Sequence, residues 1–96
     1  MVFVVTLTYT ADLDRIDAVL PAHVEWLDAQ YADGVFVASG RQVPRTGGLI
    51  LAIAEDRESL QTRLDLDPFH ALGLATHTVT EFIATRVAPG LEQLQR

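Results

Sequence analysis

Two hydrophobic periodicities alternate along this chain, and their order restricts the possible folds more than any other feature of the sequence. Apolar residues recur at every second position in strand-like segments and at every third or fourth position in helix-like segments. Strands are predicted at residues 2–9, 35–43, 49–54 and 76–87. Helices are predicted from Asp12 to Gly34, from Asp56 through Leu64, and as a short turn from Asp67-Pro68 to Gly73. The order is strand, helix, strand, strand, helix, strand.

This order is typical of the ferredoxin-like βαββαβ unit, an α+β fold with a four-stranded antiparallel sheet and both helices on one face. The chain of 96 residues forms one domain, residues 1–96, with no room for a second core. The strand at 49–54 is apolar on both faces, with Leu49, Leu51 and Ile53 on one and Ile50, Ala52 and Ala54 on the other. Because the helices cover only one side, we assign the second set to the uncovered face and predict a homodimer that packs sheet to sheet.

The charge balance excludes one class of partner. Thirteen acidic residues outnumber seven arginines, lysine is absent, and the formal net charge is −6. Nucleic-acid binding requires clustered positive charge and is therefore disfavoured. Without cysteine the chain has no disulfide, thiolate metal ligand or thiol nucleophile. The first ten residues lack a basic leader, and no apolar run approaches the ~20 residues that span a bilayer, so we expect a soluble cytoplasmic protein with no membrane partner.

One histidine stands beside the apolar stripe of the first predicted helix. The stripe recurs at spacings of three and four and comprises Leu13, Ile16, Leu20, Val24, Leu27 and Tyr31. His23 and Trp26 flank it, so the imidazole is partly desolvated. Pro21 predicts either a kink or a new helical segment, whose positive end would also favour the neutral imidazole. His23 is thus a candidate general base, although a histidine hydrogen-bonded to a backbone carbonyl would show the same pattern.

A second candidate is the aspartate that precedes a proline. Asp67-Pro68 is a common helix start, because Asp caps the first turn and Pro fits the first helical position, so capping alone explains the pair. A cap carboxylate at the sheet edge could also orient a histidine, keeping one ring nitrogen protonated so that the other acts as a base. The two roles are compatible.

The segment at residues 39–48 concentrates two arginines, Arg41 and Arg45, in an acidic protein. The planar fork of arginine suits a carboxylate, which makes an acidic small molecule a candidate ligand. Ordinary pairing with neighbouring acidic side chains is the plainer alternative. Gly47 and Gly48 precede a strand and not a helix, so the segment is no P-loop.

Other catalytic chemistries find little support in the sequence. The side chains that could bind a metal match no established ligand spacing; they are His23, Asp67, His70 and His77. Ser39 and Ser59 are the only serines, and neither lies in a G-x-S-x-G motif. We therefore expect no metal and no cofactor.

The sequence contains five short motifs, each once and in this order: Pro21-Ala22-His23-x-x-Trp26-Leu27, Ala38-Ser39-Gly40, Pro44-Arg45-Thr46-Gly47-Gly48, Asp67-Pro68-Phe69 and Gly73-Leu74. Together they resemble the YciI-like (YCII-related) proteins over almost the whole chain. The resemblance implies a dimeric ferredoxin-like fold of the dimeric α/β-barrel superfamily. It also implies an active-site cleft with a histidine and an aspartate, which fall here on His23 and Asp67. The enzymatic relatives implied by this resemblance act on muconate-type or chlorinated ring-cleavage acids by proton transfer and elimination.

Two positions depart from the pattern of that family. Leu20 stands where many members have arginine before the Pro-Ala-His, and Arg41 stands where proline often follows the glycine. Leu20 lacks the anion contact that an arginine would make at that position, and Arg41 is placed to supply such a contact instead.

These observations lead to a hypothesis of a small dimeric lyase or isomerase acting on an acidic small molecule. His23 would be the general base or acid and Asp67 would orient it. The expected substrate-binding residues are Trp26, Ser39, Gly40, Arg41, Arg45 and Phe69. The alternative is a non-catalytic dimeric module that binds a ligand or partner, in which Asp67 merely caps a helix. An accessory domain separated from a larger enzyme is a third option.

Overall fold

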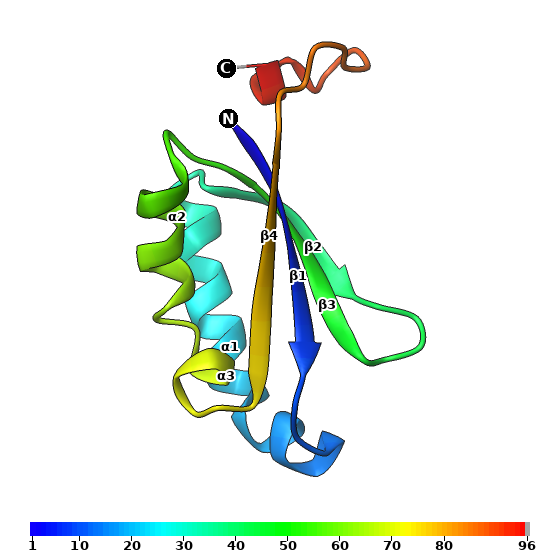
Figure 1. The fold of residues 1–96 in the computed structure, drawn as a ribbon, viewed down its shortest axis with the longest axis vertical. Coiled ribbons are helices and arrows are strands. Elements are labelled where there is room, and N and C mark those ends of the chain that lie inside the picture. Colours follow the sequence, from blue (N-terminus) through cyan, green and yellow to red (C-terminus); the bar gives the residue numbers. More distant parts are fainter. Residues whose placement is uncertain (96) are drawn as a thin grey trace.

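The computed structural model describes residues 1–95 and has the predicted ferredoxin-like α+β fold. Its elements are β1 (Val2–Tyr9), α1 (Leu13–Ala32), β2 (Phe36–Arg41), β3 (Gly47–Ile53), α2 (Arg57–Leu64), α3 (Pro68–Ala71), β4 (Ala75–Phe82) and the 3₁₀ helix η1 (Glu92–Gln95). The four strands form one antiparallel sheet in the order β2-β3-β1-β4. Figure 1 shows α1, α2 and α3 gathered on one face of this sheet, which leaves the other face without a helix.

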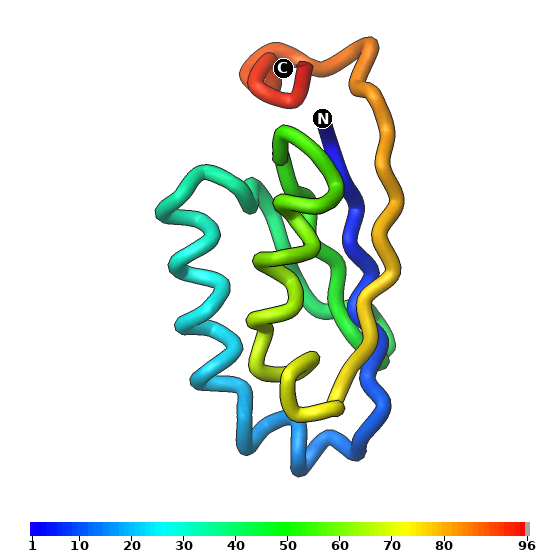
Figure 2. The backbone as a smooth tube through the Cα atoms, turned by 60° about the vertical axis from the view of Figure 1, so that its left-hand side comes forward, coloured from blue at the N-terminus to red at the C-terminus, as the bar shows by residue number. Residues whose placement is uncertain are grey.

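Helix α1 begins and ends as its sequence predicts. The Asp12 side chain accepts a hydrogen bond from the Arg15 N–H at 3.1 Å, and Gly34 ends the helical segment with a φ of 75°. Pro21 does not divide the helix, which is continuous over 20 residues. Its light-blue first turns run at an angle to the cyan remainder, as expected of a proline kink (Figures 1 and 2). His23 consequently lies in mid-helix, and no positive helix end acts on its imidazole.

The core between sheet and helices is formed by alternate residues of the two central strands. On β1, Phe3, Val5 and Leu7 are buried beneath the helices. They divide into two hydrophobic clusters, one around Phe3 and Val5 and the other around Leu7. His23 lies at the border of these clusters, because its ring contacts Trp26 of the first and Phe69 of the second.

The predicted faces of β3 are reversed in the structure. The residues expected on the uncovered face pack in the core beneath the helices; they are Ile50, Ala52 and Ala54. Leu49, Leu51 and Ile53 alternate with them on the helix-free face, where Leu49 is 44% exposed. Both sets are apolar, so the alternation alone could not tell which set faces the helices. Register decides it, because Ile50 pairs with Val5, a residue of the core.

Two strands are shorter than predicted. β4 ends at Phe82 and not at Val87, because its only neighbour is β1 and Phe82 pairs with Val2, the first residue of that strand. Ile83, directly beyond, is 77% exposed. β2 covers Phe36–Arg41 and not residues 35–43, and β3 begins two residues early, at Gly47.

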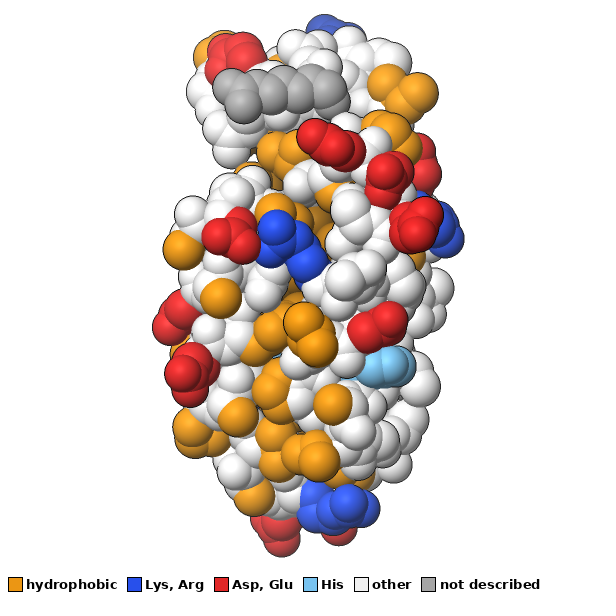
Figure 3. All heavy atoms as spheres, turned by 90° about the vertical axis from the view of Figure 1, so that its left-hand side faces the viewer, with side chains coloured by type: hydrophobic (Ala, Val, Ile, Leu, Met, Phe, Trp, Pro, Cys, Tyr) orange, Lys and Arg blue, Asp and Glu red, His pale blue; other side chains and the backbone are white. Residues whose placement is uncertain are grey.

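The helix-covered side carries a stripe of hydrophobic side chains along the long axis of the molecule, with acidic side chains at its margins (Figure 3). Among residues 1–95, no helix has the length and the apolar character needed to cross a bilayer.

Candidate active site

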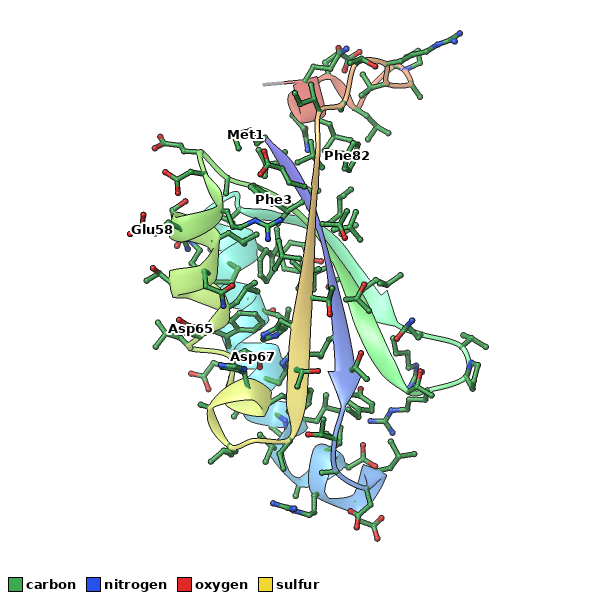
Figure 4. All side chains as sticks on the ribbon, in the orientation of Figure 1. Met1, Phe3, Glu58, Asp65, Asp67 and Phe82 are labelled. Atoms are coloured by element: carbon green, nitrogen blue, oxygen red, sulfur yellow. The ribbon has the colours of Figure 1, made fainter. Side chains whose placement is uncertain are left out.

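The site is built around the carboxylate of Asp67, which lies at the turn between α2 and α3 (Figure 4). Its Oδ1 accepts a hydrogen bond from the Phe69 N–H at 3.0 Å, so Asp67 caps α3 as the sequence predicts. The side chain is fully buried. A cap with this burial is unusual, because an ionised carboxylate needs further donors when water is excluded.

Two histidines supply those donors from different elements of the fold. Nδ1 of His23, on α1, donates to Oδ1 of Asp67 at 2.7 Å. Nε2 of His77, on β4, donates to Oδ2 at 3.0 Å. The direction follows from chemistry, since an ionised carboxylate only accepts hydrogen bonds. Asp67 therefore joins α1, α3 and β4 through one side chain.

The donors around Asp67 also decide its ionisation state. Burial by itself would raise the pKa of this carboxyl group. The hydrogen bonds from His23 and His77, the charge interaction with His23 and the hydrogen bond from the Phe69 N–H outweigh that effect and lower the pKa to about 2. Asp67 is consequently an anion at neutral pH, although it is inaccessible to solvent.

The His23 ring is held between two aromatic side chains. It stacks on Phe69 with ring centroids 4.1 Å apart and planes 11° apart, and Trp26 lies 5.5 Å away at a tilt of 36°. With Nδ1 engaged by Asp67, Nε2 is the remaining ring nitrogen, and it has no hydrogen-bond partner within residues 1–95. This arrangement produces an oriented imidazole with one nitrogen free to exchange a proton.

A cleft of about 260 Å³ opens beside this imidazole, between α1 and the β2–β3 edge of the sheet. It brings together five of the residues expected at the site: His23, Ser39, Gly40, Arg41 and Phe69. Most of the remaining wall is apolar and comes from Leu7, Leu20, Val24, Leu27 and Ile50. Ser39 is also engaged, because its Oγ lies 2.7 Å from the hydroxyl of Tyr31. The polar groups of the cleft are thus few and concentrated at His23 and Arg41.

The other expected site residues lie outside the cleft lining. Asp67 stands behind His23, and Trp26 is a core residue whose Nε1 donates to the Arg63 carbonyl at 3.1 Å. Arg45 forms an ion pair with Asp17 at 2.6 Å, the surface pairing that the sequence left open as the plainer alternative. Arg41 has no acidic partner within the described chain, which distinguishes it from Arg45.

Two polar residues of the site were not assigned to it from the sequence, although His77 was weighed there as a metal ligand. His77 contacts Asp67, and the signal was available in the alternation of β4, where threonines at 76, 78 and 80 leave His77 on the helix-covered face. Tyr9 also lines the cleft, and its ring meets that of Phe69 edge to face at 6.0 Å. As for metals, no cluster of three or more suitable side chains occurs in residues 1–95.

The fold and the site together define a ferredoxin-like α+β protein with a buried imidazole–carboxylate pair beside a small apolar cleft. The chain belongs to the YCII-related domain family, whose model matches residues 1–83. Among solved structures it is similar to the 5-chloro-2-hydroxyhydroquinone dehydrochlorinase (TftG) of Burkholderia phenoliruptrix AC1100, in complex with 2,5-dihydroxybenzoquinone. That match has a TM-score of 0.75 and 19% identity, and it covers 85% of this chain and 93% of that one. No curated protein matches the chain.

Proposed function

We propose that this protein is a small enzyme of the lyase or isomerase type, which moves a proton on an acidic small molecule bound in the cleft beside His23. The observation that carries the proposal is the 2.7 Å hydrogen bond from His23 Nδ1 to the buried, ionised Asp67. The bond keeps the proton on Nδ1 and leaves the lone pair on Nε2, the form that a general base requires.

The proton transfer would proceed as follows. Nε2 of His23 accepts a proton from a carbon or hydroxyl group of the substrate, and the charge of Asp67 stabilises the imidazolium that forms. In an elimination, the electrons of the broken bond form a new double bond and the leaving group departs with its bonding pair. In an isomerisation, His23 returns the proton to another atom of the substrate. Neither reaction needs a nucleophile from the protein.

The cleft indicates which kind of molecule it would hold. Its walls are mostly apolar, and Arg41 presents a guanidinium that no acidic side chain within residues 1–95 neutralises. Arg45 is less suited to this role because Asp17 already binds it. We therefore propose a small acid with an apolar or planar body, whose anionic group pairs with Arg41. The structurally similar TftG was solved in complex with a molecule of this kind, 2,5-dihydroxybenzoquinone.

The test is a panel of small acids incubated with the protein in D₂O, followed by NMR for solvent deuterium and by ion chromatography for released chloride. The panel includes 2,5-dihydroxybenzoquinone, 5-chloro-2-hydroxyhydroquinone and cis,cis-muconate. We expect turnover of at least one compound, with a loss of about 10²–10⁴-fold in His23→Gln. His70→Gln, at a half-exposed histidine that does not touch Asp67, is the matched control. Turnover that survives His23→Gln would refute the proposal.

A second candidate function is a non-catalytic ligand-binding module, and it is favoured by the cap that Asp67 provides for α3. The same panel separates the two, because a module would bind acids without turnover. NMR titration of His23 adds a second criterion. A His23 midpoint that does not change in Asp67→Asn would favour the module.

For both candidate functions we propose a homodimer formed through the helix-free face of the sheet. This face carries Val4, Leu49 and Leu51 around a shallow hollow of about 390 Å³, which extends to Gly40 and Arg41 at the rim of the cleft. A second copy on this face would cover apolar surface and close the cleft on one side.

A further inference from the structure

We infer that His77 is a positioning residue of the site: its Nε2–H holds Oδ2 of Asp67, so that the carboxylate presents Oδ1 to His23 and the mobile proton is carried by His23 alone. The inference deepens the proposed function and rests on the role of His23 as proton carrier. It assigns different tasks to two histidines that contact the same carboxylate.

The geometry fixes the tautomer of His77. Its ring is 3% exposed, and Nε2 lies 3.0 Å from Oδ2 of Asp67. Because an ionised carboxylate offers no proton, Nε2 must carry one. Nδ1 of His77 is buried and has no hydrogen-bond partner within the described residues. A proton on Nδ1 would therefore be a buried donor without an acceptor, which is unfavourable, and more so when the ring is charged.

The charges around His77 lead to the same assignment. Asp67 is the one anion in contact with both imidazoles, so it can balance one imidazolium and not two. From α3, His70 faces His77 with ring centroids 5.3 Å apart, and Asp65 lies 3.8 Å from His70 and not beside His77. Within residues 1–95, no further anion is therefore placed to compensate a charged His77. His23 is better suited to the extra proton because this residue lines the cleft, whereas His77 does not.

This division of tasks predicts what happens when the donor on His77 is removed. Oδ2 of Asp67 loses a hydrogen bond that it cannot replace with water, so the carboxylate becomes more basic and attracts the proton of His23 more strongly. The NMR titration midpoint of His23 should then rise. A residue that merely fills space at position 77 would change stability without moving that midpoint.

The experiment is NMR of ¹⁵N-labelled histidine rings, without substrate, in the wild type and three variants. In the wild type we expect the Nε2–H tautomer for His77. In His77→Leu the His23 midpoint should rise by at least about half a unit. In His77→Gln, whose amide can donate to Oδ2, it should stay near the wild-type value. His70→Gln, beside the same ring but not on Asp67, should have no effect.

An Nδ1–H tautomer of His77, titration of His77 before His23, or equal midpoints in the Leu and Gln variants would each overturn the inference. The tautomer measurement needs no substitution, so an Nδ1–H tautomer would overturn the inference even when His77→Leu does not fold. Because none of these measurements involves turnover, they remain interpretable when no substrate is found, and a failure of the proposed function is seen separately in the acid panel.

Discussion

The imidazole of His23 lies flat on the phenyl ring of Phe69, with centroids 4.1 Å apart, while the backbone N–H of the same phenylalanine donates to Oδ1 of Asp67. One residue thus orients both members of the pair, through its side chain on one and its backbone on the other. Phe69, the residue directly after Asp67-Pro68 at the start of α3, therefore helps to position both His23 and Asp67.

Replacing Phe69 with leucine should separate these two contributions. The backbone hydrogen bond to Asp67 remains, but the flat support under His23 is lost. We expect turnover to fall by about tenfold or more and stability by about 1–3 kcal/mol, measured by steady-state kinetics and urea unfolding. Phe36→Leu is the matched control, because Phe36 is equally buried and contacts Trp26 but not His23. Equal effects of both variants on turnover would contradict a specific role of Phe69.

The two arginines should respond differently to substitution. Arg41→Gln removes the cleft guanidinium and should weaken binding of an acidic ligand by about tenfold, seen as a higher KM or a higher Kd in calorimetry. Arg45→Gln breaks the ion pair with Asp17 and the contact of the guanidinium with the Tyr9 ring, and should change affinity little and stability by less than about 1 kcal/mol. If Arg45→Gln weakened ligand binding more than Arg41→Gln, Arg45 and not Arg41 would be the residue that contacts the anion.

Asp67 should contribute stability that disappears in acid. Its pKa is lowered from 3.8 to about 2 in the folded protein, so the ionised form stabilises the fold above pH 4 and this contribution is lost as the pH falls toward 2. The shift corresponds to about 2 kcal/mol. The difference in free energy of unfolding between the wild type and Asp67→Asn should shrink by that amount between pH 5 and pH 2. If the free energies of unfolding of the wild type and Asp67→Asn changed in parallel with pH, the pKa of Asp67 would not be lowered. Asp28→Asn, which alters an exposed carboxylate, provides the reference.

The helix-free face should control assembly. Leu49→Glu places a charge on the face where we expect the second copy, and it should convert a dimer into a monomer in light scattering at micromolar concentration. Leu66→Glu alters a leucine that is 69% exposed outside the sheet and should leave the mass unchanged. A monomeric wild type would eliminate the dimer from the proposal.

Two glycines of the β2–β3 hairpin should differ in their tolerance of a methyl group. A Cβ on Gly47 would lie 1.7 Å from the Leu7 carbonyl oxygen, so the backbone of β1 or β3 would have to shift. A Cβ on Gly40 would meet no atom within 4 Å. We expect Gly47→Ala to lower the free energy of unfolding by about 3 kcal/mol or more, and Gly40→Ala to change it by less than about 1 kcal/mol. Thermal unfolding of both variants provides the comparison.

Much of the fold could be predicted because local signals and global pattern agree. Asp12, Asp56 and Asp67 are caps in the sequence and caps in the structure, and β1 has the predicted bounds. The errors arose where the outcome depends on partners distant in sequence. The face of β3 depends on its register with β1, and the end of β4 depends on where β1 begins. Neither can be obtained from the periodicity of a single segment.

The candidate site could be predicted to a similar extent. His23 and Asp67 were identified as a candidate pair, and their side chains meet in the structure. The division between Arg41 and Arg45 needed the position of Asp17, which lies 28 residues from Arg45. His77 was weighed only as a metal ligand, because its neighbours are threonines and its role depends on a contact that crosses from β4 to the α2–α3 turn.

The bond between His23 and Asp67 joins residues that are 44 positions apart. Closing a loop of that length carries an entropic penalty that a single hydrogen bond does not offset, so the contact depends on the packing of α1 and α3 around it. The oriented imidazole is therefore present only when these elements are packed together. Any partly folded species would contain both side chains and yet lack the basic centre, which makes this pair a reporter of complete folding.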